Sequence, residues 1–415
     1  MATILLVLPP CAYASDSIAS RVIPEITVSL LTCAPGSDIY ELEGHTGLRL
    51  SSKDFDFVVN WGLFDFDSPG FVYRFVKGET DYMVGASPTD RFLAYYSHTG
   101  RAVTEQTLNL DSMQALRVYQ LVGEALQGDP HYRYNYVKDN CALRPLRLLQ
   151  KAIAPDSLAL GKPDLTEREA STFRRAMTSY HNHYPWYQFG IDLALGSGID
   201  RTLDEGEIAF APVALSQMMA GASIIAPSGK SVPAVTATTQ PVAGAPGGVV
   251  LPSTPWYLTP MTAAILIMLI TAFFTWADMV RRIITRWFDA CLFGLYGLAG
   301  CIIAFLVIVS VHEATSPNYL LLWLNPFCLL VTALIWSPGG RRFLLYYHYA
   351  NLAALIAMCI LMPVMNQTVN LAFIPLVIAD AMRSLSYIYV TRCERKRKKR
   401  RNRYQIKYSA YSSCR

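Results

Sequence analysis

A histidine and a cysteine about 100 residues apart could together carry out acyl transfer. His45 lies in the segment EGHTGLRL, which begins at Glu43, and Cys141 lies in YNYVKDNCALR, which begins at Tyr134. A thiolate is a strong nucleophile, and a neighbouring imidazole can remove the thiol proton and later return it to a leaving group. The pair therefore predicts chemistry that passes through a thioester.

Cys141 follows Asp139 and Asn140 at the start of a predicted helix over residues 141–153. A helix N-terminus carries partial positive charge and free amides, which lower the pKa of a thiol. The same amides are suited to hold the oxyanion of a tetrahedral intermediate. A buried structural cysteine is the alternative interpretation.

The chain has nine cysteines, but only Cys33 and Cys141 fall in the predicted exported domain. In an oxidising compartment two such residues can form a disulfide, which would leave no nucleophile. Cys33 is also the rival nucleophile, although no helix is predicted directly after it.

His45 is expected at the start of a strand, between residues of little bulk. A third polar group normally orients such an imidazole, and Asn60 on the next predicted strand is our choice. Asp65 and Asp139 are competing candidates. The sequence contains no HExxH, paired CxxC or P-loop motif, so we predict neither a metal nor a cofactor.

Four residues are assigned to substrate binding. Tyr134 and Asp139 precede the cysteine by seven and two residues, whereas His312 and Asn318 bound a short polar loop between two apolar segments. A plain connecting loop is the alternative for the second pair.

The first half of the chain alternates short apolar runs with turn signals and then shows helical periodicity. Strands are predicted at 23–32, 46–50, 55–61, 71–76 and 103–110, and helices at 91–97, 111–127, 141–153 and 166–180.

The second half is long and apolar enough to cross a bilayer several times. Charged residues make up 16% of the chain, against about 25% in soluble domains. Five candidate spans of membrane length occur at 257–276, 288–311, 319–336, 344–364 and 368–390. The fifth contains Asp380 and Arg383, which are unfavourable in lipid.

The net charge of +5 is unevenly distributed. Residues 392–415 hold 11 Lys/Arg and one acid, or +10, so the rest of the chain carries −5. Basic residues also occupy the first and third loops between spans, while the second and fourth have none. This alternation predicts a cytoplasmic tail that touches anionic lipid, with the N-terminal domain outside. It argues against nucleic-acid binding.

The domain organisation follows from these segments. Residues 1–14 end in Ala12-Tyr13-Ala14 and predict a signal peptide. Residues 15–225 form the predicted catalytic domain, and residues 226–255 are poor enough in large apolar side chains to predict a linker. Residues 256–391 form the membrane domain and 392–415 the basic tail.

Several blocks of the chain resemble the Lnb-type lipoprotein N-acyltransferases, with their periplasmic N-terminal domain. The similar blocks are LLTCAPGSDIYELEGHTGLRL, VVNWGLFDFDSPGFVYRFVKGETDYM, YRYNYVKDNCALRPLR and PWYQFGIDLALGSGIDR, and SVHEATSPNYLLLWLNP resembles a segment between that family's membrane helices. The blocks with the cysteine and the histidine are the most specific.

The resemblance implies an α+β, circularly permuted papain-like (NlpC-related) domain in which the histidine strand precedes the cysteine helix. An all-α membrane domain of about five helices would follow. The resemblance also implies transfer of an acyl chain from a phospholipid to the N-terminal amine of a diacylglyceryl-Cys lipoprotein at the cell inner membrane. His45 and Cys141 carry over as the pair, whereas the third residue does not carry over securely.

Two other functions remain open on the sequence. The same pair of residues would serve a membrane-anchored cysteine peptidase or amidase acting on cell-wall peptide, although five spans exceed what such an enzyme needs. A non-enzymatic membrane scaffold with a Cys33–Cys141 disulfide is the third hypothesis.

Overall fold

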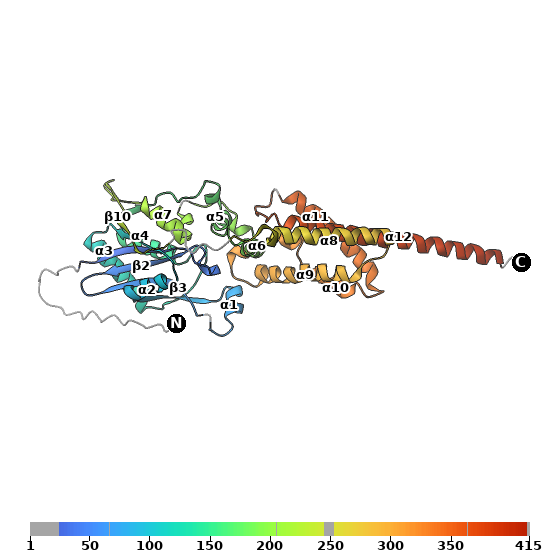
Figure 1. Ribbon diagram of the computed structural model, residues 1–415, viewed down its shortest axis with the longest axis horizontal. Coiled ribbons are helices and arrows are strands. Elements are labelled where there is room, and N and C mark those ends of the chain that lie inside the picture. Colours follow the sequence, from blue (N-terminus) through green and yellow to red (C-terminus); the bar gives the residue numbers. More distant parts are fainter. Residues whose placement is uncertain (1–24, 66, 205, 245–252, 363, 413–415) are drawn as a thin grey trace. The chain divides into compact units, whose positions relative to one another are not determined.

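The computed structural model describes residues 25–65, 67–204, 206–244, 253–362 and 364–412. The chain divides into two compact units. The first, here called the sheet unit, comprises the chain through His183 and Thr202–Pro252; the second, the helical unit, comprises Tyr184–Arg201 and Ser253–Arg415. Figure 1 labels most of their α-helices and several strands. The predicted signal peptide lies outside the described residues.

The sheet unit is built on a seven-stranded sheet of antiparallel pairs in the order β10-β5-β1-β2-β3-β4-β6. The strands are β1 Thr27–Cys33, β2 His45–Ser51, β3 Asp56–Leu63, β4 Asp81–Pro88, β5 Val103–Leu108, β6 His131–Arg133 and β10 Val235–Val242. The register sets Cys33 opposite His45 and Gly47 opposite Asn60. Because side chains alternate along a strand, Cys33, His45 and Asn60 share one face of the sheet.

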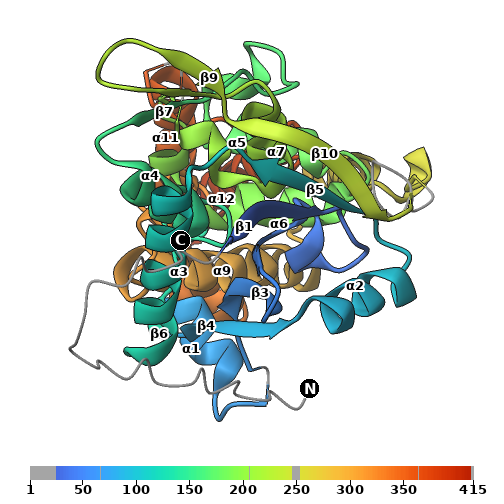
Figure 2. The ribbon, with the colours of Figure 1, turned by 90° about the vertical axis from the view of Figure 1, so that its left-hand side faces the viewer.

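Helices cover both faces of this sheet (Figure 2). On one side, Phe92 and Tyr96 of α2 (Thr89–His98) pack against strand residues that include Leu31 and Val58. On the other lie α3 (Ser112–Gln127) and α4 (Leu143–Ile153), which contact each other. The Asp111 side chain caps α3 in a capping box, as its N-cap position predicts. The predicted helices at 91–97, 111–127 and 141–153 are therefore present.

Two local predictions for the sheet unit are wrong. Residues 71–76 were expected as a strand, but α1 (Phe71–Lys77) is a helix because its apolar residues recur at helical spacing after the left-handed Gly70. The 166–180 helix is shorter: Thr166 and Glu169 form their capping pair, but α5 begins only at Phe173, where Thr172 caps it. The sheet unit also contains α7 Pro212–Ala220, β7 Ser157–Ala159, β8 Ser223–Ile225 and β9 Ser231–Pro233.

The predicted linker at 226–255 is also corrected in part. Residues Ser231–Pro233 form β9, and Val235–Val242 form β10, which pairs with β5 at the edge of the large sheet. Most side chains of β10 are exposed. An edge strand is held by backbone hydrogen bonds to its neighbour, so a segment too polar to build a core can still be ordered.

Four helices among the described residues of the helical unit are long and apolar enough to cross a bilayer. They are α8 Pro260–Arg281, α9 Arg286–Ile308, α11 Gly340–Leu361 and, over residues Phe373–Arg403, α12 Phe373–Ser412. They correspond to the first, second, fourth and fifth predicted spans.

The third predicted span, 319–336, is a shorter and broken apolar segment. It contains two 3₁₀ turns, Tyr319–Leu322 and Pro326–Cys328, followed by α10 (Leu329–Leu334). Pro326 has no amide hydrogen to continue a helix. The break packs closely on α9, because a Cβ added to Gly300 would lie 2.5 Å from the carbonyl carbon of Asn325.

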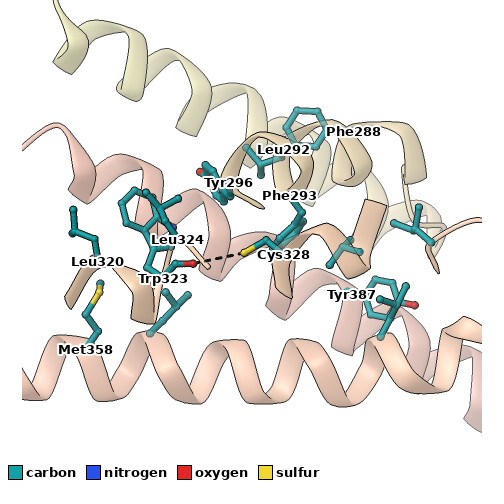
Figure 3. Close-up of a cluster of buried hydrophobic side chains, with 14 of the residues drawn as sticks. Phe288, Leu292, Phe293, Tyr296, Leu320, Trp323, Leu324, Cys328, Met358 and Tyr387 are labelled. Atoms are coloured by element: carbon teal, nitrogen blue, oxygen red, sulfur yellow. Dashed lines mark hydrogen bonds between the residues drawn. The ribbon is translucent and has the colours of Figure 1, made fainter. Parts of the chain in front are cut away.

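An aromatic core holds the helical unit together (Figure 3). Trp323 from the broken segment packs against Tyr296 of α9, with ring centroids 5.5 Å apart, and the Cys328 thiol donates to the Trp323 carbonyl at 3.7 Å. Arg383 in α12 is fully buried and is bound by Asp278 at 2.6 Å and Asp289 at 2.5 Å. This pairing explains how the fifth apolar segment tolerates a charged residue.

The segment Tyr184–Arg201 interrupts the sheet unit in sequence but belongs to the helical unit. Within its helix α6 (Pro185–Ala194), the Asp192 carboxylate accepts a hydrogen bond from the Asn370 side chain at 2.8 Å. Gly196 donates to the Ala314 carbonyl at 2.9 Å. The expected catalytic domain 15–225 is therefore divided between the two units.

Candidate functional site

Cys141 sits in a turn that Asn140 organises, just before α4 begins at Leu143. The Asn140 carboxamide oxygen accepts from the amides of Ala142 at 3.0 Å and Leu143 at 2.9 Å. Its nitrogen donates to the carbonyls of Tyr136 and Phe210, both at 2.7 Å. Asn140 is 3% exposed. The turn is thus held on both sides, and its first amides are already occupied by a side chain.

The Cys141 sulfur is surrounded by hydrogen-bond donors. The Thr46 amide and the Tyr134 hydroxyl interact with it and, with the amide of Cys141, act to lower the pKa of the thiol. Burial nevertheless dominates and raises the pKa of the thiol to about 11, while these three donors lower it. The expected depression of the thiol pKa by a helix N-terminus is therefore wrong, because the sulfur is buried and the amides of the next two residues point to Asn140.

His45 is the first residue of β2, and its ring is held by Asn60 on β3. The distance from His45 Nε2 to Asn60 Oδ1 is 3.1 Å. Burial lowers the pKa of His45 to about 4; the Asn60 contact opposes this shift, and the Arg101 charge adds to it. The side chain keeps partial exposure, and at neutral pH the imidazole is uncharged.

The Cys141 sulfur lies next to the start of β2. Thr46, whose amide reaches the Cys141 sulfur, directly follows His45 in the chain. A neutral thiol and a neutral imidazole are therefore held at one strand end, and sulfur-directed donors favour the thiolate when it forms.

Two glycines permit this close approach. Gly62 has φ +87°, and a Cβ there would lie 3.2 Å from the Tyr134 ring and 3.7 Å from Cys141 Cβ. Gly44 has φ +83°, and its Cβ would lie 2.5 Å from the Cys33 carbonyl oxygen. A side chain at either position would combine backbone strain with a steric conflict.

Cys33, the rival nucleophile, is fully buried and is a free thiol, as is Cys141. Burial raises the pKa of Cys33 to about 12. The Cys33–Cys141 disulfide of the scaffold hypothesis is therefore absent from this structure, and the Cys33 thiol is poorly suited to ionise.

The two acids that competed with Asn60 are directed elsewhere. Asp65 accepts from the Asp67 amide at 3.0 Å in an exposed loop. Asp139 is held by Arg144 through two hydrogen bonds of 2.9 and 2.6 Å, and Arg147 adds a third at 3.2 Å. Of the three candidates for the third residue, Asn60 is the one whose side chain contacts the His45 ring.

Tyr134 is fixed by aromatic neighbours as well as by the sulfur. Its ring stacks on that of Tyr82, with centroids 4.4 Å apart. Burial holds the pKa of Tyr134 well above its usual range. The hydroxyl therefore remains a donor at the site at neutral pH.

Comparison with known proteins gives a consistent result for both halves of the chain. Residues 17–180 match the family model of the Lnb N-terminal periplasmic domain, and residues 252–396 match that of the Lnb transmembrane domain. The chain belongs to the Lnb family. No curated protein matches it significantly, and no solved structure does.

Membership of the Lnb family suggests a membrane enzyme that modifies lipoproteins, with a periplasmic N-terminal domain and a C-terminal transmembrane domain that suit an inner-membrane protein. Within the described ranges of this Lnb-family chain, no group of three His, Cys, Asp or Glu side chains is arranged to hold a metal ion.

The two predicted binding residues of the later loop belong to the helical unit. Asn318 is 4% exposed, donates to the Leu193 carbonyl at 3.0 Å and accepts from the amide of Leu320 and the side chain of Gln367, both at 3.1 Å. His312 is half-buried, and its carbonyl accepts from Thr315 at 2.8 Å. Asn318 thus joins three segments of the helical unit, and substrate binding by either residue stays a prediction.

Sequence reasoning gave no role to Asn140 or to Glu43. The signal for Asn140 was present, because asparagine is a preferred capping residue and it directly precedes the cysteine. Glu43 is 7% exposed although it is an acid in a turn, and nothing in its spacing indicated burial.

Proposed function

We propose that this Lnb-family protein is a thiol acyltransferase that moves an acyl chain from a phospholipid to the N-terminal amine of a diacylglyceryl-Cys lipoprotein. In the first half-reaction His45 takes the thiol proton as the Cys141 sulfur attacks the lipid ester carbonyl. The new C–S bond replaces the ester C–O bond, and the His45 proton goes to the departing lysophospholipid oxygen.

The second half-reaction regenerates the thiol. The acceptor amine attacks the thioester carbonyl, the C–N bond forms and the C–S bond breaks. His45 takes a proton from the attacking nitrogen and returns one to the sulfur. Dividing a slow ester aminolysis into two thioester steps is the advantage of the nucleophile.

One observation carries the proposal: the Cys141 sulfur interacts with Tyr134 and with the amide of Thr46, the residue that directly follows His45, whose ring Asn60 holds. Asn60 fixes the ring, and its amide oxygen can accept a hydrogen bond from Nε2–H, which leaves Nδ1 as the basic nitrogen. The Tyr134 hydroxyl and the Cys141 amide are the donors we assign to the oxyanion.

Fold and topology are part of the same proposal. The strand of His45 precedes Cys141 and the helix that follows it, which is the order of a permuted papain-like domain. The C-terminus is assigned to the cytoplasm, because basic residues gather at the α8–α9 turn, at the first turn of α11 and after residue 391. No cofactor takes part; the partners are the phospholipid donor, the lipoprotein acceptor and the membrane.

The test is replacement of Cys141 by alanine in a strain that depends on this protein for lipoprotein N-acylation. We expect lipoproteins with a free amino terminus to accumulate, as seen by mass spectrometry of their N-terminal lipopeptides. Cys33→Ala, which removes the other thiol among the described residues of the sheet unit, is the matched control and should leave N-acylation intact. Continued N-acylation with Cys141→Ala would refute the proposal.

A further inference from the structure

Glu43 is a buried acid beside the nucleophile for which the acyl-enzyme step has no use. It is 7% exposed, and its charge acts on the Cys141 thiol, whose pKa it raises. Gly44, in the left-handed region, turns the chain between Glu43 and His45. The acid and the imidazole therefore stand two residues apart at the start of β2.

The immediate surroundings of Glu43 do not neutralise it fully. The Tyr136 hydroxyl donates to the carboxyl group, and His181 Nε2 lies 3.7 Å from Oε1. Among the described residues, Glu43 Oε1 is buried with no partner within hydrogen-bond distance. A buried carboxylate oxygen in this state is suited to receive a cationic N–H donor.

Tyr136 connects the Glu43 carboxyl group to the surface. The residue is 39% exposed, although its hydroxyl reaches the buried carboxyl. Tyr136 therefore links Glu43 to the surface of the sheet unit, five residues before Cys141. A donor that replaces the Tyr136 hydroxyl would bind Glu43 within the same site as the sulfur.

The acceptor brings such a donor. The α-amino group of a lipoprotein has a pKa of about 7.7–8.0 and arrives mainly as an ammonium ion at neutral pH. Only the free amine can attack a thioester, so one proton must leave before the C–N bond forms. His45 is neutral and accepts the second proton, which the nitrogen loses after attack.

We propose that Glu43 binds the acceptor's α-ammonium group and removes its first proton, so that it acts as a second catalytic base specific to the aminolysis step. This inference rests on the proposed acyltransferase function. The Glu43 carboxylate becomes a carboxylic acid, the amine attacks, His45 carries the second proton to the departing sulfur, and Glu43 afterwards releases its proton to water. Atoms and charge balance without any further reactant.

The ionisation of Glu43 supports this role. Burial raises the pKa of Glu43 to about 7, and the Tyr136 hydrogen bond opposes the rise. A base whose pKa lies close to that of the ammonium ion exchanges its proton at neutral pH with little energy cost.

The experiment separates the two half-reactions in the purified full-length protein, reconstituted in phospholipid vesicles with a labelled acyl chain. Wild type, Glu43→Gln and the surface control Glu79→Gln are each allowed to form the acyl-enzyme. Each is then mixed with a diacylglyceryl-Cys lipopeptide or with hydroxylamine, which is uncharged at neutral pH. Loss of the labelled thioester gives the aminolysis rate.

Glu43→Gln should still acquire the acyl label and should react with hydroxylamine at the wild-type rate. With the lipopeptide at pH 6.5 its aminolysis should be about fivefold slower, because about 5% of an α-amine is uncharged there, whereas about a quarter of Glu43, with a pKa of about 7, is ionised. The deficit should shrink to within about twofold at pH 8.5, where most of the amine is free. Glu79→Gln, whose acid forms a partly exposed ion pair with Lys77, should match wild type.

The possible failures are distinguishable. Wild-type lipopeptide aminolysis by Glu43→Gln at pH 6.5 would overturn the role of Glu43 and leave the acyltransferase intact. Failure of Glu43→Gln to form the acyl-enzyme would show a structural role and would also overturn the inference. Absence of an acyl-enzyme in wild type would remove the proposed function itself.

Discussion

His45 Nε2 lies 3.1 Å from Asn60 Oδ1, across the antiparallel pair of β2 and β3. The contact follows from the sheet register, which sets Gly47 opposite Asn60 and so brings Asn60 onto the same face as His45. Because glycine has no side chain, the space above Gly47 is left for the two polar groups. The orientation of the imidazole is thus fixed by the most regular part of the fold.

Asn60→Ala should lower the rate of acyl-enzyme formation by roughly 10- to 10²-fold. The reason is that His45 would lose its orienting partner but remain present, so the loss should stay below the roughly 10²–10⁴-fold contribution of a general base. Asn60→Asp is the informative companion, because a carboxylate at this distance stabilises the imidazolium and raises the pKa of His45. We expect the acid limb of its pH–rate profile to move to higher pH. An unchanged profile for Asn60→Asp would contradict the assigned contact.

Gly62→Ala should damage the site more than its small change in volume implies. The substitution places a Cβ against Tyr134 and Cys141 at a positive φ, so we expect a loss of stability of about 1–2 kcal/mol together with reduced activity. Gly123→Ala is the matched control: it lies in α3, has no atom within 4 Å of the added Cβ and should be neutral or stabilising by up to about 1 kcal/mol. Equal behaviour of the two variants in unfolding and activity assays would argue against the close packing described.

Stability should depend on pH through Glu43. Burial raises its folded-state pKa from 4.5 to about 7, so its contribution is present in full below pH 4.5 and is lost as the pH rises toward 7. Glu43→Gln removes this titration, and its stability relative to wild type should therefore increase over that window by up to about 3 kcal/mol. Unfolding of the full-length protein at pH 4.5 and pH 8 measures the difference.

His45 contributes with the opposite dependence. Its folded-state pKa lies below the ordinary value of 6.5, so the stability it provides is present above pH 6.5 and is lost as the pH falls toward 4. A Glu43→Gln protein should therefore still lose stability on acidification. A pH-independent difference between wild type and Glu43→Gln would contradict the burial of a titrating Glu43.

Cys33→Ala should retain acyltransferase activity, because the Cys33 thiol is fully buried with a pKa raised to about 12. Loss of a buried sulfur should cost about 1 kcal/mol of stability. Counting of free thiols in the unfolded, unreduced protein should find both Cys33 and Cys141 reactive. Detection of a disulfide between them would return the scaffold hypothesis to consideration.

Local signals in the sequence predicted much of the site. His45 and Asn60 lie on strands that the alternation of apolar residues predicted, and Cys141 precedes a helix whose apolar residues recur at helical spacing. Because consecutive strands often pair with each other, Asn60 on the next strand was expected to lie near His45. These are inferences over a few residues or between adjacent strands, where pattern and register decide the outcome.

What the sequence could not predict depended on distant partners. Residues 235–242 have the composition of a linker but are ordered as β10 by the exposed edge of β5. The buried state of Cys141 comes from β2 and from Tyr134, so the local argument for a low thiol pKa failed. Similarly, Arg383 is tolerated in an apolar helix because Asp278 and Asp289 come from two other helices.

The central claim is that Cys141 carries the acyl chain. The most direct measurement is mass spectrometry of the full-length protein after brief incubation with phospholipid vesicles and no acceptor, followed by proteolysis under conditions that preserve thioesters. The account predicts one acyl group on the peptide that contains Cys141, removed by hydroxylamine and absent from Cys141→Ala. An acyl group on a different residue, or acyl transfer to lipopeptide by Cys141→Ala, would contradict it.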